Sequence, residues 1–229
     1  MIPLSLKNPQ IVGAIASLKA LPSVESLPLA AFDVAEIRLL EEDAVDDRWT
    51  AFPRAFERHG KPTLLTIRTK EEGGTWDDAV RTPVFRNAIP HVAAVDIELR
   101  SAIRREVIAM AKDQGRTVIG SFHDFAGTPS LEQLHRLADQ ACAEKLDVLK
   151  VAVMVGSRED LWTLIPFLQE SRKKLPVCII GMGPRGLASR VFFPMIGSCL
   201  TYGFLGDSTA PGQISCVRMR ELMRELGGG

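Results

Sequence analysis

The sequence has 229 residues, of which 46% are hydrophobic and 24% charged, a balance typical of globular proteins that excludes disordered and collagen-like chains. The 28 Lys and Arg residues equal the 28 Asp and Glu residues in number, which disfavours nucleic acid or an anionic membrane surface as a partner. No apolar run approaches the roughly 18 residues of a membrane helix, and the start lacks a signal-peptide pattern, so we expect a cytoplasmic protein with reduced cysteines.

Short apolar runs rich in Val, Ile, Leu and Ala recur along the chain and predict parallel strands that are buried on both faces. Their spacing of roughly 20 to 30 residues is the length of one strand–helix unit, and eight such units predict a single (β/α)₈ barrel over residues 1–229. A doubly wound open sheet is the alternative, but no Gly-x-Gly-x-x-Gly follows an early strand. The predicted strands are Ile11–Ala16, Phe32–Leu39, Thr63–Arg68, Ala93–Leu99, Thr117–Phe122, Val148–Val155, Val177–Gly181 and Leu200–Leu205.

Helical patterns lie between these runs. Thr128 is the predicted N-cap of one helix, because Pro129 follows it at the first helical position. Ser101 is the predicted N-cap of another, and Pro166 is expected to end or kink a third. The predicted helices are Asp46–Glu57, Ser101–Gln114, Pro129–Glu144, Arg158–Ser171 and Pro211–Leu226.

Polar residues stand at the ends of the predicted strands, where an apolar run gives way to charge. In a parallel barrel these ends meet at the mouth that binds ligands, so we expect their side chains to converge there. The Glu71-Glu72-Gly73-Gly74 turn follows the third strand and is either a solvated loop or a segment that folds over the mouth. The strand-end residues are Glu36, Arg38, Arg68, Asp96, Glu98 and His123.

Lys150 lies inside the sixth apolar run, and period-two alternation places it on one face with Val148 and Ala152. One interpretation is an interior lysine that is ion-paired with Asp96 or Glu98. The other is an amine nucleophile, kept partly uncharged by burial and neighbouring cations, that condenses with a carbonyl to form an iminium. An iminium acidifies the adjacent C–H, and His123 is the natural base for that proton unless it is only a structural histidine.

The last two units carry residues that suit an anionic ligand. Gly181–Gly186 is glycine-rich and is followed by Ser189-Arg190, and residues 209–213 precede the last predicted helix. Barrels often hold an anion at these two positions, and a guanidinium beside backbone N–H groups suits a carboxylate or a phosphate. Tight-turn glycines and a surface arginine are the simpler alternatives.

Taken in order, seven segments of the chain resemble the type I 3-dehydroquinate dehydratases, which are Schiff-base lyases of the shikimate pathway. They span nearly the whole chain, and this ordered set is much more specific than any single segment. The family is a (β/α)₈ barrel and is usually dimeric. The matching segments are Glu36-Ile37-Arg38, Arg68 with Glu72-Gly73-Gly74, Asp96-Ile97-Glu98, Ser121–Phe125 with Thr128-Pro129, Asp147–Ala152, Met182-Gly183 with Ser189-Arg190, and Ala210–Ile214.

The resemblance implies the chemistry. Lys150 forms the imine with the ring ketone of 3-dehydroquinate, a small-molecule substrate. His123 removes a proton from C2 and protonates the departing C1 hydroxyl, so that water leaves and 3-dehydroshikimate forms, while Glu72 orients His123. No metal or organic cofactor is needed, because the lysine imine is the electron sink. We therefore expect an enzyme that acts as a homodimer.

The resemblance also implies how substrate is held. Arg190 pairs with the substrate carboxylate, helped by Gln213. Thr209 stands where the family usually has serine, so the hydroxyl is kept with an added methyl group. Only about ten residues precede the first predicted strand, fewer than the hairpin that commonly closes the barrel bottom needs. The residues expected to hold the ring hydroxyls are Glu36, Arg38 and Arg68.

Two other functions share parts of this pattern. A class I aldolase acting on a sugar phosphate would use the same lysine and would bind phosphate at the last two loops. A non-catalytic relative of the fold would bind a ligand without turning it over, but every chemical group the reaction needs is present in this sequence.

Overall fold

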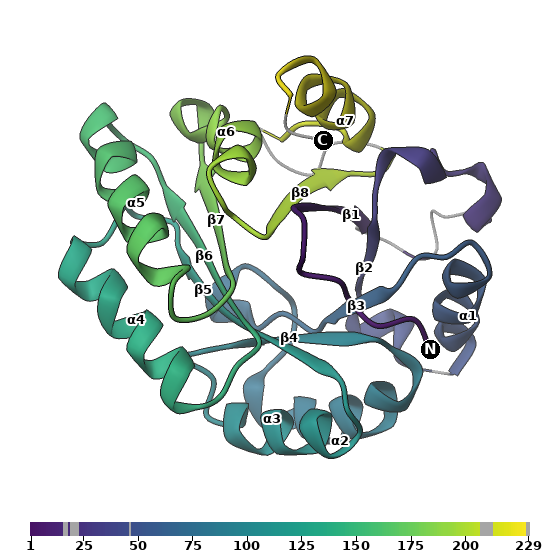
Figure 1. The fold of residues 1–229 in the computed structure, drawn as a ribbon. Coiled ribbons are helices and arrows are strands. Elements are labelled where there is room, and N and C mark those ends of the chain that lie inside the picture. The colour runs from purple at the N-terminus through teal and green to yellow at the C-terminus, as the bar shows by residue number, and fades with distance from the viewer. Residues whose placement is uncertain (16–17, 19–22, 46, 207–212, 228–229) are drawn as a thin grey trace.

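In the computed structural model, which describes residues 1–15, 18, 23–45, 47–206 and 213–227, parallel strands form a nearly closed barrel surrounded by helices (Figure 1). This confirms the predicted (β/α)₈ barrel over the open sheet. Strands and helices alternate along the chain, as right-handed crossovers between parallel strands require. The strands are β1 Gln10–Ile15, β2 Val34–Arg38, β3 Thr63–Thr66, β4 Ala94–Glu98, β5 Thr117–Asp124, β6 Val148–Met154, β7 Val177–Met182 and β8 Leu200–Phe204.

The strand order is β7-β6-β5-β4-β3-β2-β1-β8, so β1 lies between β2 and β8, and β7 and β8 are the two ends of the ladder. At the seam between those ends, the Cys199 N–H donates to the Val177 carbonyl at 2.8 Å. The Ser198 hydroxyl then accepts from the Ile179 N–H at 3.1 Å. A side chain thus replaces one backbone bond where the barrel closes.

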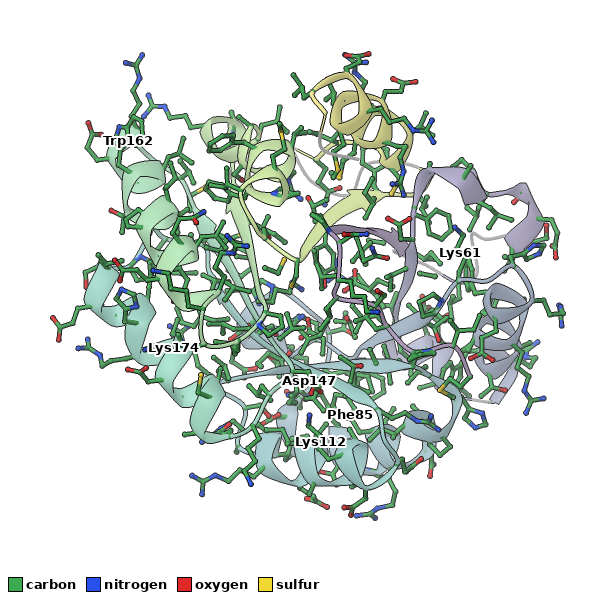
Figure 2. All side chains as sticks on the ribbon, in the orientation of Figure 1. Lys61, Phe85, Lys112, Asp147, Trp162 and Lys174 are labelled. Carbon is green, nitrogen blue, oxygen red and sulfur yellow. The ribbon has the colours of Figure 1, made fainter. Side chains whose placement is uncertain are left out.

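The helices cover the outside of the barrel (Figure 1). α2 and α6, each of which contains a proline, were not predicted from the sequence. α5 runs through Pro166 instead of ending there; Pro166 removes the bond to the Trp162 carbonyl, and Trp162 lies on the solvent side of α5 (Figure 2), where water can replace it. The helices are α1 Ala51–Arg58, α2 Asp78–Ala88, α3 Arg104–Asp113, α4 Leu131–Ala143, α5 Arg158–Ser171, α6 Ser189–Met195 and α7 Cys216–Glu225.

Two predicted N-caps are wrong. α4 is capped by Ser130, in a capping box with Gln133, whereas the Thr128 hydroxyl donates to the Met154 carbonyl at 2.8 Å and joins the loop after β5 to the end of β6. α3 begins at Arg104, after Ser101, whose hydroxyl bonds α2 instead. In both cases a tertiary partner outcompetes the local cap.

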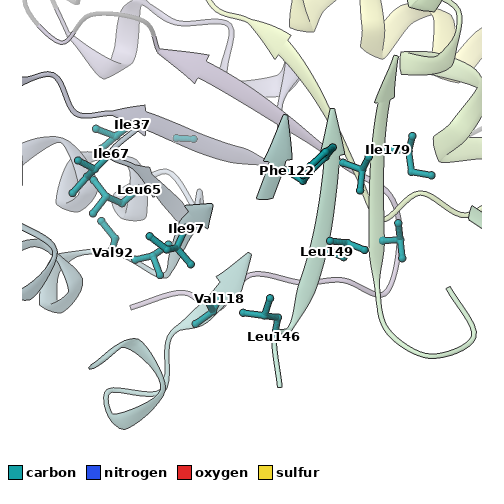
Figure 3. Close-up of a cluster of buried hydrophobic side chains, with 14 of the residues drawn as sticks. Ile37, Leu65, Ile67, Val92, Ile97, Val118, Phe122, Leu146, Leu149 and Ile179 are labelled. Carbon is teal, nitrogen blue, oxygen red and sulfur yellow. The ribbon is translucent and has the colours of Figure 1, made fainter. Parts of the chain in front are cut away.

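Two layers of apolar side chains stabilise the barrel. Leu149, Val151 and Val153 of β6 point outward into the large cluster between sheet and helices, part of which Figure 3 shows. Val148 and Ala152 point inward into a smaller cluster that fills the barrel. The predicted alternation along β6 is therefore confirmed, and it turns Lys150 to the inside.

The N-terminal residues before β1 reach the bottom of the barrel. Leu4 is buried in the inner cluster, with Leu6 packed against it. A short extended segment thus covers apolar surface at the end opposite the strand C-termini. Within the described ranges, no helix combines the length and the apolar character that a membrane crossing requires.

Candidate active site

A cavity of about 580 Å³ opens at the C-terminal ends of the strands, the end of a parallel barrel that carries its chemistry. Inward-facing residues lie two apart along each strand, and the polar side chains predicted at the strand ends meet at this cavity. Thr209 lies outside the described residues. The predicted site residues that line the cavity are Glu36, Arg38, Arg68, Glu72, His123, Lys150, Arg190 and Gln213.

Lys150 is buried near the floor of this cavity, at 5% relative exposure. Its Nζ lies 3.0 Å from Oδ2 of Asp96, so of the two acids proposed from the sequence it is Asp96 that pairs with the lysine. The same Nζ lies 4.5 Å from the ring centroid of Tyr202, whose π face favours a positive charge. A cationic nitrogen at this position is stabilised from two sides.

Asp96 is held by hydrogen bonds from several elements. Arg68 Nη2 donates to Asp96 Oδ1 at 2.8 Å, and the Ser121 hydroxyl donates to the same oxygen at 2.5 Å. Arg68 Nη1 donates to the Ser121 Oγ at 2.8 Å and lies 3.0 Å from Glu98 Oε1. Burial alone would raise the pKa of Asp96, but Arg68 and Lys150 hold it well below its usual range. A permanent carboxylate therefore accompanies Lys150.

His123 and Glu72 form a short contact at the side of the cavity, with 2.6 Å between Nδ1 and Oε2. Burial, with Arg68 and Lys150 nearby, lowers the pKa of His123 well below 6.5, so its ring is neutral at physiological pH. Burial raises the pKa of Glu72 to about 7, although Arg68 opposes this. Because Nδ1 is engaged by Glu72, Nε2 is the nitrogen left to exchange a proton with a ligand.

The loop that carries Glu72 is folded tightly against the end of β3. Gly73 has φ of +82°, a conformation that favours glycine, and a Cβ on Gly74 would collide with the Arg68 carbonyl. The Trp76 indole donates to the Leu39 carbonyl at 2.7 Å and anchors the returning end of the loop. The structure thus favours the closed form of the predicted loop, with Glu72 buried at the cavity.

Arg190, at the start of α6, faces the cavity from the side opposite β3. It is buried at 8% relative exposure, and its Nη1 donates to the Tyr202 carbonyl at 3.0 Å. Burial lowers the pKa of its guanidinium, and no carboxylate among the described residues offsets this effect. A buried cation without an acidic partner in this part of the chain is suited to bind an anionic group of a ligand.

One acidic and one basic side chain on β2 complete the rim of the cavity. Glu36 and Arg38 lie two residues apart and face inward, and Glu36 Oε1 accepts from the Thr66 hydroxyl at 2.7 Å. Arg38 is half-buried and borders the opening. These groups offer an acceptor and a donor to hydroxyl groups of a ligand.

Sequence reasoning assigned no role to three residues that shape the site. Ser121 bridges Arg68 to Asp96, and Tyr202 lies below Lys150 with a buried hydroxyl that has no partner among the described residues. Arg81 of α2 is buried and bonds Glu98. Only the inward phase of Ser121 and Tyr202 along their strands could have indicated them.

Comparisons with known proteins identify the family of this chain. The family model described as "Type I 3-dehydroquinase" matches residues 18–229. A 3-dehydroquinate dehydratase of Thermodesulfovibrio yellowstonii is 31% identical, with 97% of this chain and 98% of the relative aligned. One from Methanocella arvoryzae is 34% identical over 96% of this chain and 97% of the relative.

Among solved structures, the 3-dehydroquinate dehydratase of Geobacillus kaustophilus superposes with a TM-score of 0.82 at 26% identity, covering 96% of this chain and 92% of the other. The resemblance inferred from the seven ordered segments is therefore confirmed, as is the prediction that the chain is an enzyme. The chain belongs to the type I 3-dehydroquinase family.

Proposed function

We propose that this protein dehydrates 3-dehydroquinate to 3-dehydroshikimate in the shikimate pathway, through an imine on Lys150. The observation that carries the proposal is the shared cavity: the Lys150 amine and the His123–Glu72 pair open onto the same space, in a chain of this family. The relatives cited above are named for this activity.

The first step is condensation of Lys150 with the C3 ketone. The ammonium releases one proton so that its lone pair can attack the carbonyl carbon; the carbonyl oxygen then leaves as water, carrying this proton and one more from the nitrogen, and a cationic iminium remains. Asp96, 3.0 Å from Nζ, keeps a negative charge beside this cation throughout. The Tyr202 ring contributes a second stabilising contact. The charge that forms during the reaction thus replaces the charge that the site already accommodates.

The second step removes water from the ring. Nε2 of His123 takes the C2 proton, and the C2–H electron pair moves into an enamine with the iminium nitrogen as electron sink. The C1–O bond then breaks as the imidazolium returns its proton to the leaving hydroxyl. Glu72 at 2.6 Å supports the imidazolium, and hydrolysis of the conjugated imine frees the product and the lysine.

Binding is assigned to the groups around the rim. We assign the substrate carboxylate to Arg190 and Gln213, and the ring hydroxyls to Glu36 and Arg38. The family resemblance adds Thr209, which lies outside the described residues, as a further donor. Arg68 borders the same cavity, but three of its protein partners already occupy much of its donor capacity. Its contribution to ring binding is therefore smaller than its contribution to holding Asp96.

We also propose that the chain acts in the cytoplasm as a homodimer. The four free cysteines support the cytoplasm as the compartment. The family resemblance supports the dimer, as do Phe192 and Met195, which are exposed apolar residues on α6. Size-exclusion chromatography with light scattering measures the molar mass of the protein in solution. A monomer at micromolar concentration would contradict the dimer.

Borohydride trapping tests the proposed mechanism. The enzyme is incubated with 3-dehydroquinate and sodium borohydride, digested and analysed by mass spectrometry, while ultraviolet absorbance reports the conjugated enone product. We expect reduction to fix the ligand on Lys150 and to stop turnover. Turnover with Lys150 unmodified would overturn the imine mechanism. Absence of turnover with 3-dehydroquinate, together with an adduct from a sugar phosphate, would favour the aldolase alternative.

A further inference from the structure

Arg81, on the outer layer of the barrel, carries a guanidinium that is fully buried in a polar cluster. Its Nη1 lies 2.8 Å from Glu98 Oε2 and also donates to the Ile67 carbonyl at the end of β3. Its Nη2 donates to Asp78 on the same helix and to the Ser101 hydroxyl at 3.1 Å. One side chain of α2 thus holds the ends of β3 and β4 and the loop after β4.

Glu98 passes this contact on to the active site. While Oε2 receives Arg81, Oε1 accepts the backbone N–H of Thr69 at 3.1 Å and lies 3.0 Å from Arg68 Nη1. Thr69 is the first residue of the loop that carries Glu72, and Arg68 is the residue that holds Asp96. A single carboxylate therefore fixes the base of the Glu72 loop and the guanidinium beside Asp96.

We propose that Arg81 is a positioning residue for the dehydration: it fixes Glu98, and through Glu98 it holds Arg68 and the Glu72 loop in their catalytic places. This inference rests on the proposed function. Arg81 is not among the described residues that line the cavity, so it acts on the site indirectly, through Glu98 and through the Ile67 carbonyl next to Arg68. It is the second cation that a buried Glu98 needs while Arg68 is shared with Asp96 and Ser121.

Charge as well as position depends on Arg81. The charged and titratable groups that face Glu72 are Arg68 after β3, Asp96 and Glu98 from β4, Arg100 after β4, and His123 from β5. Without Arg81, Glu98 has Arg68 as its remaining cation, so its negative charge acts more strongly on Glu72. Protonation of Glu72 then becomes easier, and ionised Glu72 is the form that supports the imidazolium of His123.

Two neutralising variants separate this role from a general effect on folding. Arg81→Gln should move the acid limb of kcat/KM, which we assign to Glu72, to higher pH by roughly half a unit or more, and Glu98→Gln should move it to lower pH. Arg81→Lys keeps the positive charge, so the acid limb of kcat/KM should lie close to its wild-type pH. Its kcat should remain several-fold below that of wild type, because the bidentate guanidinium geometry is lost. Arg86→Gln is the matched control, because Arg86 is an exposed arginine on the same helix, paired with Glu106.

Nitrogen-15 NMR of the histidine rings gives a readout that does not depend on turnover. The His123 Nδ1 signal should respond to the ionisation of Glu72. The pH of this response should rise in Arg81→Gln and fall in Glu98→Gln, while the signals of the other histidines should titrate as in wild type. Circular dichroism establishes that each variant is folded; if Arg81→Gln is not, Arg81→Lys and Glu98→Gln carry the test.

The results distinguish this inference from the function it rests on. Wild-type protein that does not dehydrate 3-dehydroquinate refutes the proposed function. The positioning role is refuted by a different result, in which the wild type is active and the folded variants lose rate equally at every pH. In that case the acid limb of kcat/KM and the NMR titration of each variant match those of wild type. Opposite shifts for Arg81→Gln and Glu98→Gln, with none for Arg86→Gln, support it.

Discussion

Glu72→Gln preserves the size of a buried side chain and removes its ability to ionise. Burial, with Glu98 and Asp96 nearby, raises the pKa of Glu72 from 4.5 to about 7, against the pull of Arg68. The unfolded chain therefore loses this proton near pH 4.5, and the folded protein keeps it to about pH 7. Relative to the variant, wild type should lose about 3 kcal/mol of unfolding free energy as the pH rises through this window.

His123 changes stability with the opposite sign. Its pKa is lowered well below 6.5 by burial and by Arg68 and Lys150, so below that pH the unfolded chain binds the extra proton and stability falls on acidification. The lowering does not depend mainly on Glu72, so the contribution is shared by wild type and Glu72→Gln. It therefore cancels in their difference, and the difference isolates Glu72.

Urea denaturation of both proteins at half-unit steps from about pH 4.5 to 8 measures this difference. We expect wild type to be the more stable protein at the acid end, where the protonated carboxyl keeps its bond to His123, and to lose that advantage by about pH 7. Glu71→Gln, at the exposed neighbouring position, is the control and should stay parallel to wild type throughout. A wild-type-minus-Glu72→Gln difference that is constant with pH would refute the reasoning.

Three further substitutions test the assigned roles. Lys150→Met should abolish dehydration and borohydride labelling while leaving the protein folded, as circular dichroism would show; residual turnover above a thousandth of wild type would contradict covalent catalysis. His123→Ala should slow turnover by on the order of 10² to 10⁴-fold and still form the trapped imine, so a full rate in stopped-flow assays would remove His123 as the acid/base. Arg190→Gln should raise KM at least about tenfold with a smaller effect on kcat, because it removes the guanidinium we assign to the substrate carboxylate; an unchanged KM would place that group elsewhere.

The barrel could be predicted because its strands are unusually uniform. Buried parallel strands require apolar side chains on both faces, and this leaves continuous runs that a sequence displays directly. The helices were harder to predict from the sequence. α2 and α6 contain Pro83 and Pro194, and their packing against the barrel outweighs the low helical propensity of proline. Local preference alone could not show this.

From the sequence alone it follows that Lys150 shares one face of its strand with Val148 and Ala152, and that polar residues gather at the strand ends, because side chains alternate with a period of two along each strand. The folded structure was needed to show that this face points into the barrel, that Asp96 pairs with Lys150, that Glu72 reaches His123 across 51 residues, and that Arg81 joins the network at all. The two kinds of feature differ in how far apart in the sequence the residues are that determine them. Alternation is a property of one strand. An ion pair instead needs two distant backbones to place their atoms within about 3 Å, which strand register and loop packing fix together.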